Sequence, residues 1–122
     1  MDKTTTIELI DFILESISLI NRRFKDIKTS DDFIDCDDGL DKLDAISMRI
    51  QAIGEALKNL YKNENDLLLQ VADKTYWSQI IKARDFISHH YVDIDSETVF
   101  DICSNELEEL NDKVLKIKKE LK

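Results

Sequence analysis

The sequence has 122 residues, of which 43% are apolar and 35% charged, with two glycines and no proline. Seventeen basic and 26 acidic side chains give a net charge of −9. A chain of this length supports one hydrophobic core, so we expect a single domain over residues 1–122. Tight turns and phosphate-binding loops need glycine or proline, so the composition argues against sandwiches, barrels, P-loop enzymes and dinucleotide-binding folds.

The start of the chain is partly apolar but contains Glu8, Asp11 and Glu15. These acids argue against a signal peptide or a membrane span, so we expect no membrane contact. Two cysteines, Cys36 and Cys103, do not form a disulfide framework for a chain that can build a helical core. The expected location is the reducing cytoplasm.

A long helix is predicted first, because apolar side chains recur there every three or four residues. One of the threonines 4–6 is the expected cap. A polar break follows, in which Ser30 or Asp31 would cap a short turn that contains Phe33 and Ile34. The stripe of the predicted helix consists of Ile7, Ile10, Leu14, Ile17, Ile20, Phe24 and Ile27.

The second predicted helix runs from about Leu40 to Tyr61. Gly54 lies inside it at a cost of about 1 kcal/mol relative to alanine, which indicates close approach of another backbone. The following residues are predicted to connect to the next helix through a short apolar turn, 67–71. The apolar stripe, which would form core or close a dimer, is Leu43, Ile46, Ile50, Ile53, Leu57 and Leu60.

A third helix is predicted from Tyr76 or Trp77 to the paired histidines, and a fourth after Asp95 or Ser96. The fold class is therefore all-α, an antiparallel four-helix bundle. The stripe of the fourth helix is Phe100, Cys103, Leu107, Leu110, Val114, Ile117 and Leu121.

One segment of the third helix could carry chemistry. Both histidines of the chain, His89 and His90, follow five and six residues after Arg84. Histidine exchanges a proton near neutral pH, and arginine is a permanent planar cation that matches a phosphate. Such residues could cleave RNA through attack by its own 2′-hydroxyl, with arginine stabilising the charge on phosphorus and without metal or cofactor.

Helical geometry complicates this interpretation, because Arg84 and His89 would lie about 140° apart around the axis. The two side chains meet if the helix unwinds near its end, if Arg84 wraps around it, or if two subunits combine. The alternative is structural: the histidines interact with the helix dipole, Arg84 forms a surface ion pair and Tyr91 is half buried.

The sequence argues against a zinc or calcium site. The two histidines are adjacent and no paired ligand spacing exists, which argues against zinc. The aspartates near Gly39 fail the calcium-loop pattern, because Ile34 and Ala45 would occupy its first and last ligand positions. Cys103 lies on an apolar stripe and is expected to be a core thiol.

Three signatures in chain order resemble a known family. Arg84, His89 and Tyr91 form R-x4-H-x-Y, which resembles the motif of the HepT-like branch of the HEPN superfamily of helical ribonuclease toxins. The residues I-G-E-A at 53–56 and W-S-Q-I-I at 77–81 are similar to the family's second long helix and to the start of its motif helix. The segment V-D-I-D at 92–95, followed by Val99, resembles what comes after the tyrosine.

The resemblance implies a HEPN bundle, a homodimer and a composite site in which two copies of Arg84 and His89 face each other. It implies metal-independent RNA cleavage that leaves a 2′,3′-cyclic phosphate. It also implies that Tyr91 receives AMP from a partner nucleotidyltransferase antitoxin of the MNT type. Asp85 stands where asparagine is common in the family, and His90 would support or replace His89.

Two other functions stay open at this stage: a non-catalytic module of the same fold that binds a nucleotide or partner, and a helical scaffold without a site. The negative net charge of the chain does not decide between these two functions and RNA cleavage. Residues 30–44 contain seven aspartates and one lysine, so they carry −6 of the −9. Residues 74–91 are positive, so the global charge does not exclude an RNA site.

Overall fold

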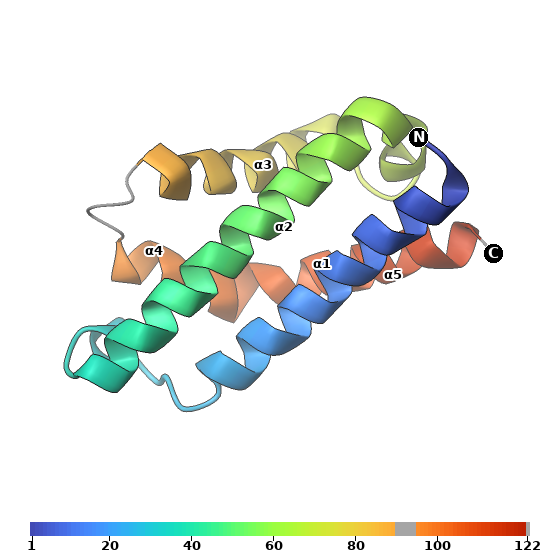
Figure 1. The fold of residues 1–122 in the computed structure, drawn as a ribbon. Helices are drawn as coiled ribbons and strands as arrows, with labels where there is room; N and C mark the ends of the chain where they lie inside the picture. The colour runs from blue at the N-terminus through green and yellow to red at the C-terminus, as the bar shows by residue number, and fades with distance from the viewer. Residues whose placement is uncertain (90–94, 122) are drawn as a thin grey trace.

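The computed structural model describes residues 1–89 and 95–121, with the backbone alone for residues 84–89. Over these residues the protein is all-α and has no strand (Figure 1). Helix α2 packs against α1 and α3, and α5 packs against α1, which confirms the predicted four-helix bundle. The elements are α1 (Lys3–Phe24), the 3-10 turn η1 (Ser30–Phe33), α2 (Asp37–Leu69), α3 (Lys74–His89), α4 (Ser96–Asp101), the π-turn η3 (Ile102–Glu106) and α5 (Leu107–Glu120).

Helix α1 begins earlier than its predicted cap. The carboxylate of Asp2 accepts a hydrogen bond from the backbone N–H of Thr5 at 2.8 Å, so Asp2 is the N-cap and the threonine prediction was wrong. Aspartate caps helices well because its oxygen satisfies an otherwise unpaired N–H group. Farther along α1, Asp11 forms an ion pair of 2.7 Å with Lys118, which joins α1 to α5.

The predicted short turn is η1, with Phe33 buried and Ile34 exposed. Its start is fixed by Asp32, whose carboxylate accepts from the backbone N–H groups of Lys28 and Thr29 at 2.7 and 3.1 Å. Thr29 is thus the cap residue, one position before the predicted Ser30 or Asp31.

The start of α2 packs directly under η1 at Gly39. A Cβ atom there would overlap the carbonyl oxygen of Asp32 and lie 3.1 Å from the carbonyl carbon of Phe33. Backbone atoms cannot move aside as a flexible side chain can, so only glycine fits this approach.

Helix α2 continues eight residues beyond the predicted end at Tyr61. Glu64 has non-helical angles (φ −139°, ψ 40°), so the helix bends there rather than stopping. Next to the bend, the amide of Asn63 donates to the carbonyl of Asn59 at 2.9 Å, and such side-chain bonds compete with the helical ladder. The residues beyond the bend still cover one end of the bundle as expected, because Leu68 is fully buried.

The fourth helix is interrupted by η3. The predicted stripe has steps of three and four, but the buried residues Ile102 and Leu107 are five apart. The N–H of Leu107 accordingly bonds to the carbonyl of Ile102, the spacing of a π-turn. The extra residue moves the inward face from Phe100 and Cys103, which are only partly buried, to Val99 and Ile102.

The apolar stripe of α2 belongs to the core of the chain itself. Every member of the predicted stripe, from Leu43 to Leu60, is at most 6% exposed. The stripe is therefore not a dimer seam. Within the described residues, no helix combines the length and apolar content needed to cross a membrane.

Candidate active site

The structure places Arg84, Asp85 and His89 in the last part of α3. The side chains of these three residues, together with His90 and Tyr91, lie outside the described part of the chain. The backbone of α3 is helical through His89. His89 follows Arg84 by five positions in the helix, which puts their Cβ directions about 140° apart. Unwinding of the helix ahead of His89 is therefore excluded as a way to bring the two side chains together.

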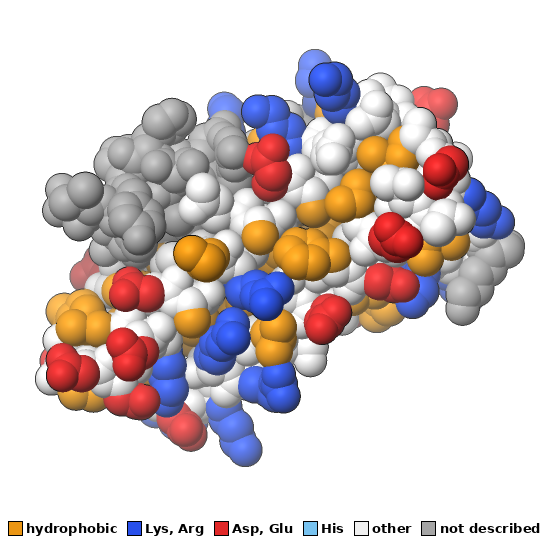
Figure 2. Space-filling model, in the orientation of Figure 1, with side chains coloured by type: hydrophobic (Ala, Val, Ile, Leu, Met, Phe, Trp, Pro, Cys, Tyr) orange, Lys and Arg blue, Asp and Glu red, His pale blue; other side chains and the backbone are white. Residues whose placement is uncertain are grey.

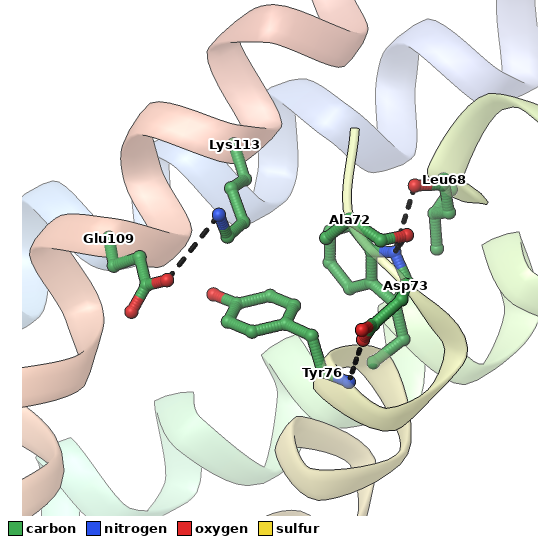
Figure 3. Close-up of polar contacts among 7 residues, drawn as sticks. Leu68, Ala72, Asp73, Tyr76, Glu109 and Lys113 are labelled. Atoms are coloured by element: carbon green, nitrogen blue, oxygen red, sulfur yellow. Dashed lines mark hydrogen bonds and ion pairs between the residues drawn. The ribbon is translucent and has the colours of Figure 1, made fainter. Parts of the chain in front are cut away.

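The opposite end of α3 is held by specific polar contacts. The carboxylate of Asp73 accepts from the backbone N–H of Tyr76 at 2.9 Å and caps the first turn. The buried indole N–H of Trp77 is shared between the carbonyl oxygens of Leu68 and Ala72, at 2.9 and 3.1 Å (Figure 3). One side chain thus ties the start of α3 to the end of α2 and fixes where the motif helix begins.

Tyr76 extends this anchor to α5 (Figure 3). Its ring meets the ring of Trp77 edge-on, with centroids 5.0 Å apart. The ammonium of Lys113 lies 4.9 Å from the Tyr76 centroid and 3.4 Å from a carboxylate oxygen of Glu109. Burial, assisted by the carboxylates of Glu109 and Glu106, raises the pKa of Tyr76 well above its usual range, so this phenol stays neutral and supports packing.

The middle of α3 rests on α2 and the fourth helix. Ile80 and Ala83 line a small apolar gap together with the buried Gly54 of α2. Gly54 thus borders the same gap as Ala83, which directly precedes Arg84, and the close approach of another backbone at Gly54 stays a prediction. The remaining lining residues are Ile50, Ile53, Ile102, Glu106, Leu107 and Leu110.

Other candidate groups do not form a site among the described residues. No cluster of three histidine, cysteine or acidic side chains there has the arrangement of a metal site. Burial raises the pKa of Cys103 to about 12, so its thiol is protonated and is a poor nucleophile. The residue is only partly buried, so the prediction of a core thiol was wrong in its position. Burial, with the carboxylates of Asp101 and Glu109, also raises the pKa of Glu106.

Sequence reasoning missed a second basic region. Arg22, Arg23 and Lys25 lie at the end of α1, and Arg49 of α2 reaches across to α1. The Arg49 guanidinium donates to the hydroxyl of Ser16 at 3.3 Å and lies 5.8 Å from the Phe12 centroid. Figure 2 shows Lys and Arg side chains over the lower centre of this face, with acids on both sides. The available signal was the run at 21–28, which has four cations and one acid.

Fold and motif together define a class, a helical bundle with an arginine and a histidine on its third helix. The profile of the ribonuclease HepT-like family matches residues 13–117, which is most of the chain. The chain therefore belongs to the ribonuclease HepT-like family, as the resemblance implied.

A curated relative supports the same assignment. A protein of Methanocaldococcus jannaschii, named "Gamma-glutamylcyclotransferase and putative RNase", is 32% identical over 114 residues. The match covers 92% of this chain and 47% of the relative, so the chain spans about half the length of that protein. No solved structure matches the chain.

Proposed function

We propose that the protein is a metal-independent endoribonuclease toxin with Arg84 and His89 as its catalytic residues. The match to the ribonuclease HepT-like family over residues 13–117 carries this proposal. The name of the M. jannaschii relative adds support, because it includes an RNase. The proposed RNA substrate supports a cytoplasmic location as part of the same proposal.

The chemistry needs one proton carrier and one phosphate-binding cation. His89 accepts the proton of the ribose 2′-hydroxyl while the 2′-oxygen attacks phosphorus. The bond from phosphorus to the 5′-oxygen breaks, and that oxygen takes a proton from water while His89 returns its proton to solvent, so the products are a 2′,3′-cyclic phosphate and a 5′-hydroxyl. Arg84 stabilises the additional negative charge on the phosphoryl oxygens in the transition state. No metal ion, redox step or covalent enzyme intermediate is involved.

A second copy of the chain completes this site. The two Cβ directions lie about 140° apart on α3, and the helix stays regular through His89. One helix therefore presents the arginine and the histidine to different sides. In a homodimer with two-fold symmetry, the Arg84 of one copy and the His89 of the other flank one phosphate, and the symmetry creates two equivalent pairs.

Tyr91 is the proposed control point. It completes R-x4-H-x-Y, and in the family this tyrosine receives AMP from an MNT-type nucleotidyltransferase antitoxin. Transfer from ATP forms a bond between the phenol oxygen and the α-phosphorus and releases pyrophosphate. The attached AMP is a bulky anion two residues from His89, so it competes with substrate phosphate for Arg84.

A second function deserves testing because of Asp85. An acid directly after Arg84, in a chain of net charge −9, weakens the positive potential for phosphate. On this alternative the protein binds a nucleotide or the nucleotidyltransferase through the same segment but does not cleave RNA. Asp85 and His90 then tune binding rather than proton transfer.

The test is RNA cleavage by the purified protein in the presence of EDTA. Arg84→Ala and His89→Ala are each expected to lower the rate by about 100-fold or more. Lys82→Ala, which removes an exposed cation from the same helix, is the matched control and should change the rate less than about threefold. Equal cleavage by all four proteins would refute the proposed site, and a wild type that cleaves no RNA but binds the nucleotidyltransferase would favour the alternative.

A further inference from the structure

The strongest feature outside α3 is an open groove between α1 and the fourth helix. Its volume is about 590 Å³, within the range of about 300 to 1,000 Å³ that is typical of small-ligand sites. One wall is the end of α1, and the other is η3 with the start of α5. The lining residues are Ile17, Ser18, Asn21, Arg22, Lys25, Cys103, Ser104, Glu108 and Asn111.

The polar side chains of this groove are available to a ligand. Within the part of the chain that the structure describes, Arg22 and Lys25 pair with no carboxylate, and the hydroxyl and amide groups of the lining make no internal hydrogen bond. Cys103 adds no charge, because its thiol has a pKa of about 12. The groove thus combines two free cations and one carboxylate, that of Glu108, with neutral donors on both walls.

The positive charge at the end of α1 is also unusual for this acidic chain. The net charge of the chain is −9, yet residues 21–28 contain four cations and one acid. Blue side chains gather over the end of α1, between acidic regions to either side (Figure 2). A local positive groove on an acidic protein directs phosphates to one place and keeps them away from the rest of the surface.

The π-turn shapes the second wall. Because η3 contains one extra residue in its turn, Ile102 and Leu107 both point into the core, while Cys103 and Ser104 line the groove. Without the π-turn, the sequence stripe would turn Cys103 inward with Leu107. π-turns inside α-helices are frequent at functional sites, and here the turn places the exposed Ser104 in the wall of the groove.

We propose that this groove binds the ribose-phosphate backbone of the RNA substrate, as a second contact distinct from the α3 site. Arg22 and Lys25 contact phosphate oxygens, and serine and asparagine side chains add the neutral contacts that are common at nucleic-acid backbones. The carboxylate of Glu108 accepts a hydrogen bond from a ribose 2′-hydroxyl, a group that DNA lacks. None of the described residues that line the groove is aromatic, so they offer no platform for base stacking and recognise the backbone whatever the sequence.

The proposal rests on the proposed function, which supplies RNA as the substrate, but its test is independent of cleavage. The full-length His89→Ala protein is titrated against a fluorescent single-stranded RNA of about 12 nucleotides in EDTA, and binding is followed by anisotropy. In this background, Arg22→Gln with Lys25→Gln is expected to weaken binding about tenfold. The slope of log affinity against log salt should fall by about 1.4, as for two lost phosphate contacts.

A matched pair of lysines controls for charge. Lys116 and Lys119 of α5 line a different groove with Gln70, Val71 and Glu120. Lys116→Gln with Lys119→Gln changes the net charge equally and should weaken RNA binding less than about twofold. Equal weakening by the two double variants would overturn the proposal, because binding would then follow net charge alone.

Two further measurements decide the ligand. Glu108→Gln should reduce the preference for RNA over DNA of the same sequence, and an unchanged preference overturns the assigned 2′-hydroxyl contact. AMP is expected to compete poorly with RNA, and equal affinity for AMP would overturn an RNA backbone in favour of a free nucleotide. If wild type cleaves no RNA while the groove variants still lose binding, only the proposed catalysis fails; if wild type cleaves and the groove variants bind normally, only the groove fails.

Discussion

The two ends of α3 are built for different tasks. At its start, Trp77 is fully buried and shares its N–H between two carbonyl groups, and Tyr76 packs against Trp77 and Lys113. At its end the sequence places Arg84, Asp85 and His89, and the proposed function assigns charge and proton exchange to this end. Stability and proposed chemistry thus occupy opposite ends of one helix. Substitutions at the two ends should therefore differ in what they change.

The largest expected effect is at the anchored end. Trp77→Ala removes the indole and leaves a cavity, so the free energy of unfolding should fall by about 3 to 5 kcal/mol in thermal or urea denaturation. Tyr76→Phe is the neighbouring control. The Tyr76 hydroxyl is buried without a hydrogen-bond partner among the described residues, so removing it should leave stability unchanged or slightly higher. A Trp77→Ala protein that unfolds like wild type would contradict the role of this anchor.

A smaller effect on stability is expected far from both ends of α3. Gly39→Ala places a methyl group against the carbonyl of Asp32, so α2 or η1 must shift, at a cost of about 1 to 3 kcal/mol. Asp41→Ala, at an exposed position in the same helix, is the control. RNA cleavage per folded molecule should stay at the wild-type level. A variant as stable as wild type would show that the close approach at Gly39 is absent.

The smallest effect is a pH dependence at η1. The pKa of Asp32 lies below its usual value of 3.8 because its carboxylate accepts hydrogen bonds from the N–H groups of Lys28 and then Thr29. A lowered pKa in the folded state means that the carboxylate stabilises the fold above about pH 4 and that this stabilisation is lost as the pH falls through the folded value.

Asp32→Asn should therefore lower the melting temperature at neutral pH, and the difference from wild type should shrink below about pH 3. Asp31→Asn is the control, because its side chain makes no hydrogen bond with another described residue. A difference that is constant over this pH range would argue against a carboxylate-specific contact.

Much of the bundle follows from apolar spacing alone. The stripe of α2 is all core, because a step of three and four residues keeps one helical face inward. In the α1 stripe the prediction holds for Ile10, Ile17, Ile20 and Ile27, whereas Ile7, Leu14 and Phe24 are only partly buried. The errors occur where single polar side chains act. Asp2 rather than a threonine caps α1, and α2 passes through a bend at Glu64 that resembled a loop in the sequence. Periodicity does not encode such local hydrogen bonds.

The fourth helix shows a second limit of periodicity. Phe100 and Cys103 fit the three-and-four spacing better than Val99 and Ile102, yet the latter are buried. A π-turn adds one residue that no regular pattern anticipates. The motif residues Arg84 and His89 were found from residue chemistry and family resemblance, whereas the groove at Arg22 and Lys25 needs the tertiary structure, because its walls are about 80 residues apart in sequence.

The central claim is a catalytic site shared between two copies of α3, and mixing inactive variants tests it most directly. Arg84→Ala and His89→Ala proteins are purified separately, mixed under conditions that allow subunit exchange, and assayed for RNA cleavage in EDTA. Half of the resulting dimers combine the two variants and contain one intact pair of Arg84 and His89, so about a quarter of wild-type activity should return. Recovery of no activity from fully exchanged dimers would contradict a shared site.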